Sequence, residues 1–414
     1  MKLIEILMLI GSIPFQTKLV DTKLNLVEEF SWKQIDYDFG GVLNRKEAID
    51  NEVYIPGASI PTGIEVWGDK MFIAIPRIKS GVPFTLNYIS LSDINTKSPI
   101  LLPYPSQVMN NFQNKSSKKA KMTSIFSIRA DPCNRLWALD TGISEEATVR
   151  KVETPPTIFI FNLNDNSLLR KYVLQENEFE TTSKFRNILI DVTSGTCENA
   201  FAYLADTKHG LVVYSWLANK SYRIKNNYFS FDPIWGNFQT NSGFNVQLND
   251  GLFGMTLTIP NHKGQRYLLF QPMIGTKEFR VKTQILQNKT LAHTNVTDFY
   301  LYGDRGDDSQ SAASYMDLEN GVLFYTTLIK NGVNCWNYNR GERLQPENQG
   351  TITEFPHKKA FPYDMKIDKN GTIWVLCNRL LDFLYDNVPE EGIPFHIYSG
   401  RVRNIIKGTP CEEI

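Results

Sequence analysis

The sequence predicts an all-β fold, a six-bladed β-propeller, and three observations lead to this prediction. First, one pattern recurs, in which a polar turn leads into a short apolar strand and then into a polar residue or another turn. Second, the copies follow one another at steps of 65, 66, 65, 55 and 51 residues, and near-regular repetition is typical of radial repeats. Third, each unit holds further β-rich segments, while strong helical periodicity is scarce. The copies, aligned on Met71, Leu136, Ala202, Tyr267, Val322 and Ile373, are GDKMFIAIP, NRLWALDTG, NAFAYLADT, GQRYLLFQP, NGVLFYTTL and NGTIWVLCN.

Each copy is expected to be a strand near the centre of its blade, with both faces covered by neighbouring blades. Continuous apolar runs such as residues 71–75 follow from this position, because neither face meets water. About four strands per unit, with six units in a ring, make a propeller. Residues 30–39 are expected to add a strand to the sixth blade, since pairing the two chain ends leaves no open sheet edge.

The second copy contains Asp140-Thr141-Gly142, the triplet that carries the catalytic carboxylate of aspartic proteases. Such an enzyme needs two carboxylates that share a proton, and the sequence has no second Asp-Thr-Gly or Asp-Ser-Gly. Asp140 is therefore expected to mark the end of a blade strand, where Thr141-Gly142 turns the chain.

The five cysteines fit the repeat. Cys133 and Cys197 precede the aligned strands of consecutive units by three and five residues, which places both on one rim and favours a bridge between neighbouring blades. Cys335 follows the fifth strand and Cys411 lies in the tail, so a second bridge would hold the C-terminus. Cys377 lies within the sixth repeated strand and is expected to be a buried free thiol.

Composition and the N-terminus bound the functional class. Lys plus Arg equals Asp plus Glu at 44 each in 414 residues, so no net charge attracts nucleic acid or an anionic membrane. Residues 1–20 are predicted to be a signal peptide and residues 21–414 a single propeller domain, without a transmembrane helix. A secreted glycoprotein is expected, with N-glycosylation sequons at Asn114, Asn219, Asn288, Asn295 and Asn370.

Eight segments together resemble one protein family, and they span residues 30 to 411. They are FSWKQIDYDF (30–39), AIPRIKSGVPFTLNYI (74–89), LLPYPS (101–106), DPCNRLWALDTG (131–142), NDGLFGMTL (249–257), GDRGDDSQSAASYMD (303–317), VLFYTTLIKNGVNCWN (322–337) and GTIWVLCNRL (371–380). The chain resembles the yellow and major royal jelly proteins of insects, and its short tail is similar to the yellow branch. This resemblance implies a secreted six-bladed propeller with two disulfides.

The resemblance also implies a ligand site. Amine-binding members of the family use a Thr just before an Asp, and an Asn followed two residues later by Phe, on loops of the last repeat. Asn378 matches the Asn, whereas Tyr363 stands in place of the Thr and Leu380 in place of the Phe. An amide and a phenol can hydrogen-bond a catechol or an amine, and a tyrosine ring can make a cation–π contact. The predicted partner is a small aromatic amine or catechol at the mouth of the central channel. In the alternative interpretation, Tyr363 and Asn378 merely close the last blade.

Three functional classes stay open at this stage. A non-catalytic binding or structural role in pigmentation, cuticle or development leads, with no cofactor. The runner-up is a dopachrome-converting isomerase of melanin synthesis, which would need one general base and one proton donor. The third is a lactonase-like, metal-dependent propeller, in which the oxygen ligands of a cation such as Ca²⁺ would include Glu65, Asp140 and Asp206. Acidic residues at strand ends are also ordinary turn formers, and no metal is predicted.

Overall fold

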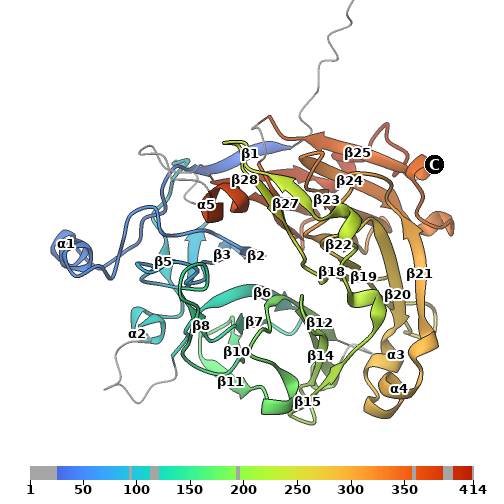
Figure 1. The fold of residues 1–414 in the computed structure, drawn as a ribbon, viewed down its shortest axis with the longest axis horizontal. Helices are drawn as coiled ribbons and strands as arrows, with labels where there is room; N and C mark the ends of the chain where they lie inside the picture. The colour runs from blue at the N-terminus through green and yellow to red at the C-terminus, as the bar shows by residue number, and fades with distance from the viewer. Residues whose placement is uncertain are drawn as a thin grey trace, which may run out of the picture.

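Six small sheets surround a common axis in the computed structural model of the chain (Figure 1). The structure describes residues 26–92, 96–111, 121–192, 196–356, 360–385 and 395–412. The predicted signal peptide and the sequon at Asn114 lie outside the described residues. Within them, no helix is both long and apolar enough to cross a membrane.

Each of the six sheets has four antiparallel strands, and this confirms the predicted six-bladed propeller. Blades one to three are β2 (Gly63–Trp67), β3 (Lys70–Ala74), β4 (Leu86–Ser90) and β5 (Leu102–Pro103); β6 (Ile125–Asp131), β7 (Arg135–Asp140), β10 (Thr157–Asn162) and β11 (Leu168–Val173); and β12 (Phe185–Val192), β13 (Ala200–Asp206), β14 (Gly210–Ser215) and β15 (Lys220–Ile224). Blades four to six are β18 (Leu252–Leu257), β19 (Tyr267–Pro272), β20 (Lys277–Lys282) and β21 (Phe299–Asp304); β22 (Ser314–Asp317), β23 (Val322–Thr327), β24 (Gly332–Asn337) and β25 (Gln349–Glu354); and β26 (Pro362–Ile367), β27 (Thr372–Cys377), β28 (Phe395–Arg401) and β1 (Val27–Trp32).

The repeated strand of the sequence is the second strand of every blade, namely β3, β7, β13, β19, β23 and β27. Its residues are almost all buried, and β7 and β23 are buried along their whole length. The strand is therefore apolar on both faces because each blade packs between two others, as the continuous apolar runs predicted.

The first strand of each blade lies nearest the axis, and these six inner strands form a closed ring. Each one contacts the inner strand of the next blade, from β2 through β6, β12, β18, β22 and β26 and back to β2. Since successive inner strands run the same way around the ring, their first residues all lie at one mouth of it. This geometry determines where a ligand site can form.

The ring closes where the two ends of the chain pair. β1 adds to β28 as an antiparallel outer strand, with Phe30 opposite Ile397 and Trp32 opposite Phe395. This confirms the predicted closure, although the strand spans Val27–Trp32 rather than the whole of residues 30–39. The chain then leaves the sheet, and Tyr37 continues inward to the core cluster that also holds Trp32.

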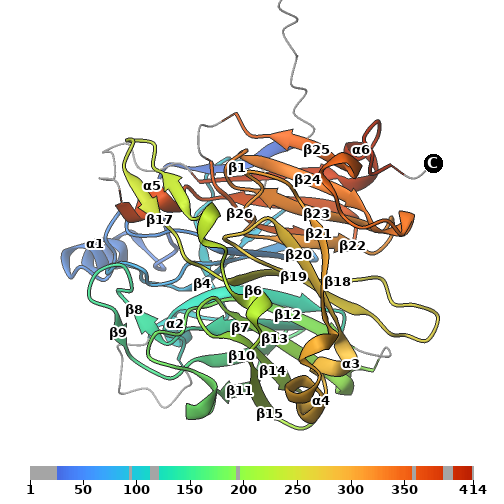
Figure 2. The same cartoon turned by 45° about the vertical axis from the view of Figure 1, so that its right-hand side comes forward.

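Both predicted disulfides are present. Cys133–Cys197 joins blades two and three, and Cys335–Cys411 ties the tail to β24. The C-terminal end accordingly lies beside β24 and β25 in both ribbon views (Figures 1 and 2). Cys377 is a buried free thiol, as predicted.

The α-helices and four short strands of the described residues lie outside the six blades. They are α1 (Val42–Asp50), α2 (Gln107–Asn110), β8 (Ile143–Ser144), β9 (Lys151–Val152), β16 (Asn237–Gln239), β17 (Asn245–Gln247), α3 (Thr283–Leu286), α4 (Lys289–Thr294), α5 (Leu380–Tyr385) and α6 (Val402–Ile405). Three sequon asparagines, Asn219, Asn288 and Asn370, are exposed, and Asn295 is half-buried. N-glycosylation at these positions stays a prediction.

Candidate functional site

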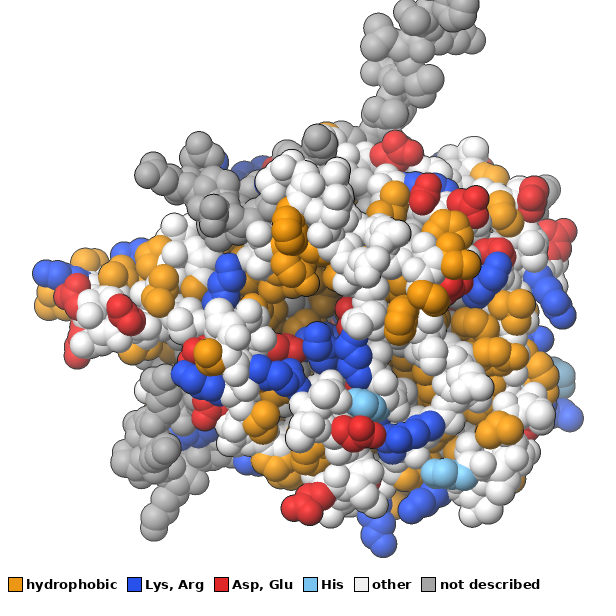
Figure 3. Space-filling model, viewed as in Figure 1, with side chains coloured by type: hydrophobic (Ala, Val, Ile, Leu, Met, Phe, Trp, Pro, Cys, Tyr) orange, Lys and Arg blue, Asp and Glu red, His pale blue; other side chains and the backbone are white. Residues whose placement is uncertain are grey.

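A cavity of about 310 Å³ opens at the mouth of the ring where the inner strands begin. We call it the mouth pocket. Its walls come from the inner strands β6, β12, β18 and β26, from the chain just before β12 and β18, and from α5. The space-filling view shows a hollow in the middle of this face, with hydrophobic side chains inside it and Lys and Arg side chains along its edge (Figure 3).

Four β-bulges build the walls. The inner strands of blades two, three, four and six each have a register shift at their second residue, and those residues are Phe126, Arg186, Phe253 and Tyr363. All four side chains line the mouth pocket. A bulge leaves one residue outside the regular alternation of the ladder and can redirect its side chain. The same irregularity in four blades thus directs three aromatic rings and one guanidinium into one cavity.

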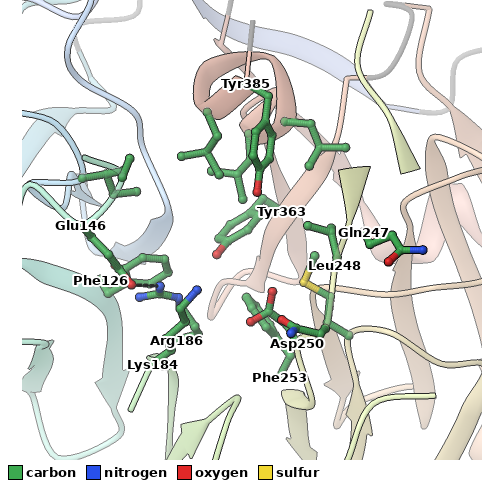
Figure 4. Close-up of a pocket in the computed structure, with 17 residues that line it drawn as sticks. Phe126, Glu146, Lys184, Arg186, Gln247, Leu248, Asp250, Phe253, Tyr363 and Tyr385 are labelled. Carbon is green, nitrogen blue, oxygen red and sulfur yellow. Dashed lines mark hydrogen bonds and ion pairs between the residues drawn. The ribbon is translucent and has the colours of Figure 1, made fainter. Parts of the chain in front are cut away.

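The aromatic wall centres on Tyr363. Its ring meets that of Phe253 edge to face at 5.6 Å between centroids and lies 6.4 Å from the ring of Phe126. Tyr363 is 3% exposed, and burial raises the pKa of its hydroxyl well above the ordinary value. The phenol therefore stays protonated and can donate a hydrogen bond to a ligand. In the close-up the Tyr363 hydroxyl points into the space above Arg186 and Asp250 (Figure 4).

Helix α5 covers the apolar side of the mouth pocket with Leu380, Leu381 and Leu384. A neighbouring loop holds the helix in place, because the Asp382 carboxylate accepts hydrogen bonds from the backbone and the side chain of Asn241 at 2.8 and 2.6 Å. Asn241 lies in the turn between β16 and β17, so this hairpin fixes the helix that roofs the pocket.

Arg186 is the charged member of the bulged set. Its Nη2 lies 2.6 Å from Oε1 of Glu146, and its guanidinium lies 4.2 Å from the centre of the Phe126 ring. Glu146 also pairs with Arg150 at 3.1 Å. Burial opposes ionisation of Glu146, but the charge of Arg186 prevails and lowers the pKa of Glu146. Arg186 is therefore fixed in place and charged.

Lys184 precedes β12 and also lines the mouth pocket. Its backbone N–H donates to Asp206 at 2.9 Å, and the Ser183 hydroxyl donates to the same carboxylate at 2.6 Å. Burial, reinforced by the nearby charge of Arg186, lowers the pKa of the Lys184 amine. Asp206 thus positions the backbone of a pocket cation.

Asp250 faces Lys184 and Arg186 from the chain before β18 (Figure 4). It accepts a hydrogen bond from Thr207 at 2.8 Å and lies 3.5 Å from the Lys208 amine. Burial opposes its ionisation, but Lys208, Lys184 and Arg186 lower the pKa of Asp250, so it is ionised.

The three residues of the predicted ligand site have different positions. Tyr363 and Leu380 line the mouth pocket together. Asn378 is fully buried, and its amide is used within the protein: it donates to the Pro61 carbonyl at 2.9 Å and accepts from the Leu380 N–H at 3.2 Å. Asn378 therefore holds the start of α5, and it affects the mouth pocket only through the position of that helix.

The acidic residues considered as metal ligands have structural surroundings. Asp140 accepts backbone N–H bonds from Thr123, Ser124 and Gly142, as expected for a residue that ends a blade strand. Asp206 occupies the corresponding place in blade three, opposite the first residue of β12. Among the described residues, no group of three His, Cys, Asp or Glu side chains could hold a metal ion.

Glu65 is the third of these acidic residues and lies on β2. Burial raises the pKa of Glu65, and the charges of Arg129 and Lys366 oppose this rise. Arg129 of β6 stacks on the Tyr315 ring of β22 at 4.3 Å, a contact between opposite blades that spans the axis of the ring. Glu65 thus belongs to a polar layer near the axis.

Sequence reasoning missed Lys184, Arg186, Phe126 and Phe253. A usable signal exists at the start of the first strand of the third unit, where KFRN (184–187) alternates cations with the core residue Phe185. The repeated second strands carry the stronger sequence pattern, and the bulges that direct Phe126, Arg186 and Phe253 inward depend on the pairing of strands.

The fold and the site define a six-bladed propeller with an aromatic, charged pocket at one mouth of its ring. The pattern of the family described as Major royal jelly protein matches residues 123–411. The chain is 33% identical to protein yellow of Drosophila madeirensis over 390 residues, which cover 94% of this chain and 67% of that protein. With protein yellow of Drosophila melanogaster the identity is 32% over 390 residues, or 94% and 71% of the two chains. The chain belongs to the family of the yellow and major royal jelly proteins.

Among solved structures, the chain is similar to a virginiamycin B lyase from Staphylococcus aureus. That structure covers 82% of this chain and 94% of its own, with 12% sequence identity and a TM-score of 0.40.

Proposed function

We propose that this protein is a secreted, non-catalytic binder of a small aromatic ligand of the catechol or aromatic-amine class, and that the ligand occupies the mouth pocket. The observation that carries the proposal is the set of four bulges, which direct Phe126, Arg186, Phe253 and Tyr363 into one cavity. A bulge interrupts a sheet ladder, and bulges are over-represented beside functional sites.

The size and chemistry of the mouth pocket support a ligand of one or two rings. A volume of about 310 Å³ falls at the small end of ligand cavities. Phe126, Phe253 and Tyr363 offer ring edges and faces to an aromatic ligand, and aromatic pairs gain about 0.5–1.5 kcal/mol beyond their buried area. The Tyr363 hydroxyl adds a hydrogen-bond donor suited to a catechol oxygen.

Secretion is supported by the two disulfides, since such bonds persist in oxidising compartments. The exposed sequons at Asn219, Asn288 and Asn370 fit the same compartment. A single measurement tests this point: expression with the native N-terminus in insect cells should deliver the protein to the medium, with its mass lowered by removal of N-glycans.

One observation favours a second candidate function, the isomerisation of dopachrome. Lys184, whose pKa is lowered by burial, and the protonated Tyr363 hydroxyl line the same cavity, and a lowered amine pKa together with a phenol donor are features that general acid–base catalysis uses. Incubation with dopachrome distinguishes the two functions. Loss of its absorbance no faster than in buffer supports pure binding, whereas an accelerated loss that Lys184→Met abolishes supports catalysis.

Calorimetric titration of the purified protein with 4-methylcatechol, dopamine and serotonin tests the binding proposal. We expect heat of binding for at least one of them, and Tyr363→Phe should weaken it about fivefold through loss of one hydrogen bond of about 1 kcal/mol. Tyr300→Phe is the matched control, since Tyr300 is 44% exposed on the outer strand β21. Absence of heat for these three ligands and for the anionic catechol 3,4-dihydroxyphenylacetate, with the protein folded, would contradict the proposal.

A further inference from the structure

We infer that the ligand of the mouth pocket carries a negatively charged group beside its aromatic ring, and that Lys184 and Arg186 bind this group. The inference rests on the proposed function and names the class of ligand, an aromatic anion such as a ring-bearing carboxylate. It differs from the aromatic amine that the family resemblance suggests, because an amine carries the opposite charge.

The balance of charge around the mouth pocket carries the first step. Two carboxylates, Glu146 and Asp250, line it together with the two cations Lys184 and Arg186. Each carboxylate also has a cationic partner outside the lining: Arg150 for Glu146 and Lys208 for Asp250. Four cationic groups therefore surround two carboxylates, which leaves an excess of two positive charges. A cationic ligand would be repelled there, and an anion attracted.

The available hydrogen-bond donors carry the second step. Among the described residues no hydrogen bond or ion pair joins the Lys184 amine to a side chain, although Lys184 lines the cavity and the charges of Asp250 and Glu146 act on it. Arg186 uses Nη2 for Glu146, while its Nη1 is buried without a hydrogen-bond partner among the described residues. A buried cationic donor that lacks an acceptor is unfavourable, so a ligand oxygen bearing negative charge would satisfy Arg186 Nη1 and could also accept from the Lys184 amine.

Rigid placement of the cations carries the third step. Arg186 is held by Glu146 and stacks on the Phe126 ring at 4.2 Å, and the backbone of Lys184 is fixed by Asp206. In the close-up both cations lie on the floor of the pocket, below the Tyr363 ring (Figure 4). A ligand can therefore place its anionic group against the cations while its ring lies against Tyr363 and Phe253. The Arg186 guanidinium, held in this way, can bind a ligand group without first having to be ordered.

Three ligands with one catechol ring and different charges test the inference. They are 3,4-dihydroxyphenylacetate, which is an anion, 4-methylcatechol, which is neutral, and dopamine, which is a cation. In calorimetry at neutral pH and low salt, we expect the anion to bind roughly tenfold or more tightly than dopamine, as a charge-assisted hydrogen bond allows. The preference should shrink as salt is added, because salt screens charges in an open pocket.

Variants of Lys184 test whether this residue causes the preference for the anionic ligand. Lys184→Met should reduce the preference for the anion at least threefold, whereas Lys184→Arg, which keeps the charge, should retain most of it. Lys171→Met is the matched control, because Lys171 is exposed on the outer strand β11 of blade two. Thermal melts of all variants check that the fold is kept.

The outcomes separate this inference from the proposed function. If none of the three ligands binds to the wild-type protein, the proposed function itself fails. If 4-methylcatechol or dopamine binds as tightly as the anion, binding stands but the anionic class is wrong. If the anion is preferred and Lys184→Met leaves that preference unchanged, the assignment to Lys184 is overturned.

Discussion

Closure of the ring by β1 makes a strong prediction for Trp32. This residue is 2% exposed, its ring stacks on that of Phe30 at 5.7 Å, and its Nε1 donates to the Pro99 carbonyl at 2.8 Å. Replacing a buried Trp by Ala costs about 4 kcal/mol, and the lost hydrogen bond adds about 1 kcal/mol. The unfolding entropy of a 414-residue chain is roughly 0.9 kcal/mol/K, at about 2.1 cal/mol/K per residue. Trp32→Ala should therefore lower the Tm by about 6 °C.

Differential scanning calorimetry of the purified protein, with both disulfides intact, measures this shift. Val27→Ala is the control on the same strand, because Val27 is 62% exposed and its replacement should change the Tm by less than about 1 °C. Limited proteolysis should in addition cut Trp32→Ala faster near β28, the strand that β1 covers. Equal melting temperatures for Trp32→Ala and Val27→Ala would refute the reasoning, since the closing strand would then add nothing to the stability of the ring.

Two further predictions concern buried polar groups. Burial raises the pKa of Glu278 to about 7 despite the opposing pull of Arg305. The Glu278 carboxyl therefore binds its proton more tightly in the folded protein than in the unfolded chain, where its pKa is about 4.5. The stability that this protonation contributes to the folded state is fully present below pH 4.5 and is lost as the pH rises through about 7. Glu278→Gln should therefore flatten this part of the Tm-against-pH curve, and an unchanged curve would count against the raised pKa. Asn378→Ala should lower stability by about 2 kcal/mol, because the Pro61 carbonyl and the Leu380 N–H lose their partner. Asn378→Ala should also weaken ligand binding, because α5 is displaced. Leu380→Ala should weaken binding more than it lowers stability. Chemical denaturation measures the stability of both variants, and calorimetry measures their binding.

The sequence was sufficient for the architecture because a propeller is built from local repeats. Each unit carries its own apolar strand between turns, so the six copies could be counted and the blade order followed from the chain order. The cysteines at the same rim of consecutive units, Cys133 and Cys197, could be paired for the same reason. The role of Asp140 at a blade end was also readable, since a carboxylate that precedes a Thr-Gly turn can accept the local backbone N–H groups.

The site was only partly readable. Tyr363 and Leu380 were predicted from the last repeat and do line the mouth pocket. Asn378 matched the same pattern, but its amide is used by Pro61, which lies 317 residues away along the chain. A contact of this length arises only when the last blade packs against the first, and no local pattern contains it.

What the sequence determined by itself was therefore the six-bladed ring, its closure and its disulfides, because the ring follows from periodicity along the chain, and the closure and the bridges follow from where the chain ends and the cysteines fall relative to the repeats. What the tertiary structure decided was the mouth pocket. Phe126, Arg186, Phe253 and Tyr363 lie in four different blades, and each faces the cavity because its inner strand slips by one residue against the neighbouring strand. Register between strands is fixed by packing across the sheet, so the direction of these side chains, and with it the charge of the site, is set only when the ring closes.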